Sequence, residues 1–166
     1  MSGRNGRLSV GLKSRATAGA LVLALGLVTA WEGYNSKVYL DAVGIPTVCY
    51  GHVVSKSIKV GQTFTNEACH NLLVSDLKIA VDAFDKLVVI KTEPYVKAAF
   101  ISFIYNVGIK SFKNSTALKL LNEGRIVDAC HELPKWVYAT ANGVKVKLKG
   151  LVNRRQAEMR LCLGEE

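Results

Sequence analysis

The first 31 residues of this chain contain neither an acidic residue nor a cysteine. Four cations, Arg4, Arg7, Lys13 and Arg15, precede the first acid, which is Glu32. An uncharged stretch dominated by Ala, Leu, Val and Gly fills the remainder of this region. A basic segment followed by an apolar one is typical of a membrane-directing signal whose positive end stays inside. Without a cysteine, the segment lacks the thiol that a redox switch within it would need.

The apolar stretch, residues 16–31, is short for a membrane span. It would form roughly 24 Å of helix, whereas the hydrocarbon core is about 30 Å thick, so we expect marginal insertion. Three interpretations are open: a signal peptide cleaved after Ala30, an uncleaved membrane tether, and a buried helix of a cytoplasmic protein. Cleavage after Ala30 would leave Glu32 without the helix that precedes it, and the one-sided basic flank argues against the buried helix.

The chain also lacks internal repeats, low-complexity tracts and long linkers, so we expect one domain. Its composition is 49% hydrophobic, enough for a real core in one lobe or two. The net charge is +9, from 22 basic and 13 acidic residues. This favours polyanionic partners such as an acidic cell envelope; nucleic acid would fit the charge, but no nucleic-acid-binding motif is present. Residues 145–149 alternate Lys with apolar residues, which predicts a solvated edge beside a cleft, with binding of glycan or anionic wall polymer as the alternative.

Glu32, Asp41 and Thr47 follow the pattern E-x8-D-x5-T. Residues 37–40 and 47–50 are typical of two short strands joined by a turn, so a hairpin would bring Asp41 and Thr47 back toward Glu32. Two carboxylates in different environments can serve as acid and base in cleavage of a glycosidic bond, and a hydroxyl beside them can hold a water. The alternative is a glutamate at a helix end followed by an ordinary hairpin.

The same segment resembles the active-site signature of phage-type lysozymes, the endolysins with which phages open their hosts. The likeness covers roughly residues 30 to 163, in the family's order. It rests on the segments 31–52, 100–108, 112–116, 121–124, 129–130 and 150–155, and on Trp136, Glu158 and Cys162. The resemblance implies an α+β, lysozyme-like fold, with a small β-sheet lobe, a larger helical lobe and the active-site cleft between them.

The resemblance also implies residue roles. Glu32 matches the general acid, Asp41 the second carboxylate and Thr47 the water-positioning hydroxyl of a reaction that inverts the anomeric carbon. Arg154 matches a basic residue that orients the catalytic glutamate and binds saccharide; the alternative for it is a solvated or salt-bridged helix face. A cation this close favours the ionised glutamate, so burial must outweigh it if Glu32 is the acid. No cofactor and no metal are implied.

In function, the chain resembles endolysins of the signal-arrest-release type. We therefore expect residues 1–31 to tether the enzyme to the periplasmic face of the host inner membrane and later to release it into the periplasm. Residues 32–166 would be a muramidase that cleaves peptidoglycan at the β-1,4 bond between N-acetylmuramic acid and N-acetylglucosamine. The alternatives are a lytic transglycosylase and a catalytically silent, membrane-tethered wall-binding domain. The expected partners are peptidoglycan and the inner membrane but not nucleic acid, and we expect a monomer.

The four cysteines agree with export, because an even number in an oxidising compartment favours disulfides. Three pairings are possible, and we expect Cys49–Cys69 in the small lobe and Cys130–Cys162 in the helical lobe. A zinc site is the alternative, but the spacings do not match the close cysteine pairs of structural zinc sites.

Hydrophobic periodicity predicts the remaining elements. We expect a short sheet within residues 37–60, a helix that opens at residues 65–67, a second that starts at residues 93–94, and shorter helices at 115–122, 125–131, 134–139 and 150–162.

Overall fold

The computed structural model describes residues 5–41, 44–141 and 143–165, and within them the side chains from Thr17 onward except that of Ala141. Arg4, and Ala42 and Val43 of the predicted turn, lie outside the described residues. The helices are α1 (Asn5–Trp31), α2 (Asn66–Leu87), α3 (Pro94–Val107), α4 (Ile109–Lys113), α5 (Thr116–Asn122), α6 (Ile126–Glu132) and α7 (Lys149–Cys162), with one 3-10 turn, η1 (Leu133–Lys135). The strands are β1 (Asn35–Leu40), β2 (Pro46–Cys49), β3 (His52–Val53), β4 (Tyr138–Ala141) and β5 (Val144–Lys147).

The helical lobe is built around α3, whose residues 96–104 are all buried. This helix packs against α1, α2 and α7, so apolar side chains are needed nearly all round it. Pro94 occupies its first turn, where the missing N–H has no helical partner to lose. The rings of Phe100, Phe103 and Phe112 contact one another, and Trp136 meets Phe103 edge-on at 5.3 Å between centroids. Phe112 is fully buried in this core, and Trp136 packs against it.

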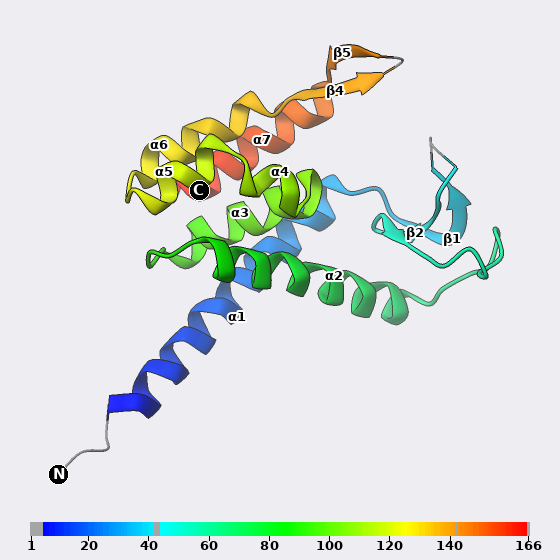
Figure 1. Ribbon diagram of the computed structural model, residues 1–166. Coiled ribbons are helices and arrows are strands. Elements are labelled where there is room, and N and C mark those ends of the chain that lie inside the picture. The colour runs from blue at the N-terminus through cyan, green and yellow to red at the C-terminus, as the bar shows by residue number, and fades with distance from the viewer. Residues whose placement is uncertain (1–4, 42–43, 142, 166) are drawn as a thin grey trace.

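The small lobe is an antiparallel sheet in the order β1–β2–β3, with a core of its own. In Figure 1 this lobe stands apart from the helical body, and α2 runs between the two. Thr65 caps α2 by accepting a hydrogen bond from the backbone N–H of Ala68, as expected at a helix start. One disulfide joins Cys49 of β2 to Cys69 of α2, and the other joins Cys130 to Cys162. Both are the expected pairs, and the α+β lysozyme-like fold is confirmed.

Helix α1 joins the helical lobe through its C-terminal half. Ala20, Ala24 and Val28 recur at i, i+4 and i+8 and are fully buried in the main core, whereas Val22 on the opposite side is exposed. The N-terminal half of α1 extends away from the body (Figure 1). Among the described residues, no helix combines the length and the hydropathy that a membrane span requires.

The helix predicted over residues 134–139 is wrong. Only the 3-10 turn η1 forms there, and β4 follows and pairs antiparallel with β5. Pro134 permits a helical first turn but cannot donate to a longer one. Tyr138 and Thr140 favour extended backbone, and Gly143, with φ of 77°, supplies the left-handed turn residue that lets the chain reverse.

Candidate active site

Glu32 lies where the helical lobe meets the small lobe. Its backbone N–H donates to the carbonyl of Val28 at 2.8 Å, which continues the hydrogen-bond ladder of α1 by one residue. Its side chain keeps about a fifth of its surface exposed, at 22%. Nη1 of the buried Arg154 donates to Oε1 of Glu32 at 2.5 Å. A Cβ placed on Gly51 would stand 3.9 Å from Oε2 of Glu32, so this oxygen faces the β2–β3 turn.

A buried network holds Arg154 from behind. Its Nε donates to Oε1 of Glu158 at 3.1 Å, and its Nη2 donates to the carbonyl of Ser102 at 3.2 Å. The hydroxyl of Ser102 donates to the same Oε1 of Glu158 at 2.8 Å. Glu158 is fully buried; burial raises its pKa, while the guanidinium groups of Arg155 and Arg154 act in the opposite direction. The guanidinium beside Glu32 is therefore fixed by two helices, α3 and α7.

Arg155 completes this network on the far side of Glu158. Its Nε lies 3.1 Å from Oε2 of Glu158, and its Nη2 donates to Oδ1 of Asn106 at 2.9 Å. The guanidinium carbon stands 5.0 Å from the ring centroid of Phe103. Burial lowers the pKa of Arg155 to about 10, so it remains a cation at neutral pH. When Glu32 and Glu158 are both ionised, the net charge of these two glutamates and the two arginines is zero.

Asp41 and Thr47 are joined through Ile45. The backbone N–H of Ile45 donates to Oδ1 of Asp41 at 2.8 Å, and the hydroxyl of Thr47 donates to the carbonyl of Ile45 at 3.0 Å. Thr47 is buried, and it pairs with Val53 in the β2–β3 ladder. The turn between β1 and β2 thus connects the carboxylate of Asp41 to the hydroxyl of Thr47 at the start of β2.

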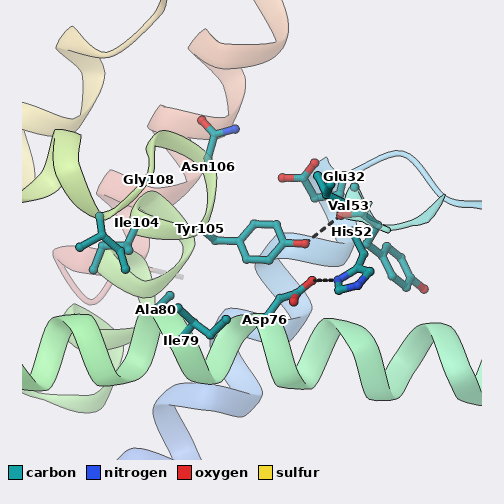
Figure 2. A pocket seen from close by; sticks show the side chains of 13 residues that line it. Glu32, His52, Val53, Asp76, Ile79, Ala80, Ile104, Tyr105, Asn106 and Gly108 are labelled. Atoms are coloured by element: carbon teal, nitrogen blue, oxygen red, sulfur yellow. Dashed lines mark hydrogen bonds and ion pairs between the residues drawn. The ribbon is translucent and has the colours of Figure 1, made fainter. Parts of the chain in front are cut away.

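A pocket of about 440 Å³ opens between the two lobes. It is lined by Glu32, the β2–β3 turn with Val53, and parts of α2, α3 and α4. Figure 2 shows the ring of Tyr105 pointing from α3 toward Glu32 and His52, with Asp76 of α2 below. Nδ1 of His52 lies 2.7 Å from Oδ2 of Asp76, so this pair connects β3 to α2 across the pocket.

Tyr105 is a neutral hydrogen-bond donor in this pocket. Its hydroxyl donates to the carbonyl of Tyr50 at 2.8 Å. Burial raises its pKa above the ordinary value, and the negative charges of Glu32 and Asp76 raise it further. The phenol therefore keeps its proton throughout the neutral range and ties α3 to the turn beside Glu32.

The four site residues predicted from the sequence form two separate pairs in the structure. Glu32 contacts Arg154 directly, and Asp41 and Thr47 share Ile45. Thr47 is connected to the pocket wall through Val53; as far as the described residues show, neither Asp41 nor Thr47 lines the pocket itself.

No functional role for His52, Asp76, Tyr105 or Glu158 was predicted from the sequence. The only available signal was that three of them, His52, Tyr105 and Glu158, fall inside the segments or positions that carry the family resemblance. The sulfurs that a zinc site would have used are instead bound in disulfides.

Comparison with known proteins gives a consistent result. Residues 29–158 match the phage lysozyme family. A SAR-endolysin of Bacteriophage PS119 is 37% identical over 153 residues, which cover 89% of each chain. The solved endolysin of Escherichia coli O157:H7 phage FAHEc1 superposes with a TM-score of 0.79 at 31% identity, covering 85% of this chain and 90% of that one. The muramidase domain of SpmX from Asticaccaulis excentricus gives a TM-score of 0.78 at 31% identity, covering 84% and 94%.

Proposed function

The chain belongs to the phage lysozyme family of cell-wall hydrolases, and from that premise we propose that it is a muramidase. Its substrate would be the β-1,4 bond between N-acetylmuramic acid and N-acetylglucosamine in peptidoglycan, and its action would lyse the host cell at phage release. The structural likeness to a muramidase domain supports this bond specificity. The contact of Glu32 with the buried Arg154 at the wall of the pocket is the observation that carries the proposal.

We assign the general acid to Glu32. Arg154 occupies Oε1, so the transferable proton would sit on Oε2, which faces Gly51 and the pocket. Glu158 accepts a hydrogen bond from Nε of the same guanidinium at its Oε1. Arg154 is therefore fixed from behind and can hold the Glu32 carboxyl in place.

Asp41 and Thr47 would activate the attacking water. The hydroxyl of Thr47 donates its proton to the carbonyl of Ile45, so its lone pairs can accept a hydrogen bond from water. Asp41, held by the backbone N–H of Ile45, would take the second water proton as the C–O bond breaks. Water attack on the face opposite the leaving group inverts the anomeric carbon.

The proposal includes control by membrane tethering. Glu32 follows α1 directly and is hydrogen-bonded to it through Val28. While α1 lay in the inner membrane, Glu32 would be at the bilayer surface and away from Arg154. Release into the periplasm would let Ala20, Ala24 and Val28 dock in the core and deliver Glu32 to the pocket. The likeness to SAR-endolysins supports this.

The first test is digestion of purified peptidoglycan, with the product ends read by mass spectrometry. Reducing muramic acid ends are expected from a hydrolase that uses water. Anhydro ends would instead indicate a lytic transglycosylase and remove the role given to Asp41 and Thr47. No soluble fragments at all would indicate a silent wall-binding domain.

Glu32→Gln supplies the matched measurement. Loss of a general acid typically slows a reaction 100- to 10,000-fold, and we expect a loss in that range with folding intact by circular dichroism. Glu67→Gln, which neutralises an exposed acid in the first turn of α2, is the control and should digest normally. Normal lysis by the Glu32 variant would refute the acid assignment.

A further inference from the structure

The hairpin formed by β4 and β5 has two chemically different faces. Its register pairs Tyr138 with Lys147 and Thr140 with Lys145. Residues directly opposite in an antiparallel pair share a face and successive residues alternate between faces. Tyr138, Lys145 and Lys147 therefore lie on one face, and Val144 and Val146 lie on the other.

Both faces are exposed. Val144 keeps 62% of its surface accessible, Val146 40% and Tyr138 48%, and Leu148 directly after β5 is exposed as well. Nζ of Lys145 stands 5.0 Å over the ring of Tyr138. Within the described residues, no acid forms an ion pair with Lys145 or Lys147. Figure 1 shows β4 and β5 projecting from the helical body.

The base of the hairpin is fixed by packing and by a backbone hydrogen bond. Val137 is buried, and its carbonyl accepts a hydrogen bond from the backbone N–H of Leu148 at 2.9 Å. A two-stranded ribbon alone is marginally stable in water. Here one face is apolar and exposed to water, and the other carries Lys145 and Lys147, neither of which forms an ion pair with a described residue.

We propose that this hairpin is an interfacial contact for an anionic lipid bilayer. The valine face would enter the headgroup boundary, while the lysine stems extend along the ribbon and place their ammonium groups among the phosphates. The ring of Tyr138 belongs at the same level, because amphipathic aromatics favour the membrane interface. A glycan or an anionic wall polymer would satisfy the lysines but leave the valines in water, and so the lipid surface accounts for both faces.

This contact is separate from the proposed insertion of the N-terminal segment, and a local probe keeps the two apart. Val146→Trp in the full-length chain places a fluorophore on the apolar face, and lipids brominated in their acyl chains quench any indole that enters the bilayer. Quenching is measured as the excess over the unsubstituted protein, whose Trp31 and Trp136 give the background. Val60→Trp, at an exposed position beside the small lobe, is the matched control.

With vesicles of phosphatidylcholine and phosphatidylglycerol, the Val146 variant should show excess quenching and the Val60 variant none. Pure phosphatidylcholine should reduce this excess. Adding Lys145→Gln and Lys147→Gln should weaken the hairpin contact about fivefold for each lysine removed, whereas Lys110→Gln with Lys113→Gln, which removes the same charge from α4, should leave the Val146 quenching unchanged.

Three results would overturn the proposal. The first is quenching of the Val146 variant no greater than that of the Val60 variant. The second is equal quenching with and without phosphatidylglycerol. The third concerns the Lys145→Gln, Lys147→Gln double variant made in the Glu32→Gln background. The proposal fails if this variant loses more of its binding to purified peptidoglycan than of its binding to vesicles. That third result would assign the hairpin to the cell wall.

Discussion

Glu158→Gln should be among the most destabilising isosteric changes in this protein. Its carboxylate is fully buried and forms ion pairs with both Arg154 and Arg155. The glutamine amide can still accept the hydrogen bond from Ser102. The substitution nevertheless leaves the positive charges of Arg154 and Arg155 with a single negative charge, that of Glu32, to balance them. Its N–H₂ group would also meet the Nε–H of Arg155, donor against donor. Removing one partner of a buried ion pair typically costs about 3–5 kcal/mol, a large share of the 5–15 kcal/mol that holds an ordinary domain folded.

The chain contains a control with the same spacing. Arg125, the residue before α6, and Asp128 in its first turn form an i, i+3 pair at 2.8 Å, as Arg155 and Glu158 do at 3.1 Å on α7, but their side chains are 58% and 53% exposed. Asp128→Asn should cost less than about 1 kcal/mol because exposed pairs are well hydrated. Urea unfolding followed by circular dichroism measures both free energies, and an unchanged m-value verifies that the two unfolded states are comparable.

A second substitution tests the physical cause. If the cost comes from uncompensated buried charge, Arg155→Met in the Glu158→Gln background should recover part of the lost stability, although Arg155→Met alone should destabilise. A double-mutant cycle gives that coupling directly. The reasoning fails if Glu158→Gln costs no more than Asp128→Asn, or if the two changes at positions 155 and 158 simply add.

Two further predictions concern the disulfides and the pocket tyrosine. Alanine at Cys130 and Cys162 should lower the free energy of unfolding by about 3–4 kcal/mol, because the bond closes a 32-residue loop in the unfolded chain; a loss below about 1 kcal/mol in calorimetry would contradict this. The raised pKa of Tyr105 means that the unfolded chain releases this proton first as the pH rises, so folded protein binds more protons above pH 10 and stability falls there. Tyr105→Phe should make that alkaline fall less steep in urea titrations, and an identical slope in the two proteins would show that Tyr105 does not contribute.

Sequence patterns predicted those helices and strands whose formation depends on residues close together in the chain. The capping threonine and the apolar period of residues 68–80 predicted α2, and Pro94 predicted the start of α3. The strand–turn–strand pattern predicted the hairpin with Asp41 and Thr47. The pattern of residues 134–139 did not predict β4, because Pro134 is equally compatible with the first turn of a helix and with the 3-10 turn that forms.

The charged centre behind Glu32 could not be read from the sequence. Arg154 and Glu158 are four residues apart, a spacing that on most helices indicates a solvated ion pair. Only the packing of α3 against α7 buries them. The contact of His52 with Asp76 joins elements 24 residues apart with no periodic relation. Sequence patterns report which face of a helix is apolar, but they do not report which polar face another element will cover.

The small side chains of α1 connect the fold to the proposed release. Ala20 and Ala24 are fully buried against the helical lobe, in which α1 packs on α3, and overpacking a buried site typically costs about 1–3 kcal/mol. The same alanines, with Gly19 and Gly26, make the segment weakly hydrophobic compared with a leucine-rich span. Under the proposed tethering, the small apolar residues of α1 therefore suit both the membrane-inserted and the released form. They permit weak insertion into the membrane, and they permit α1 to pack against the helical lobe without steric strain. Larger apolar residues at positions 20 and 24 would shift both equilibria in the same direction, toward the membrane and away from the position in which Glu32 reaches Arg154.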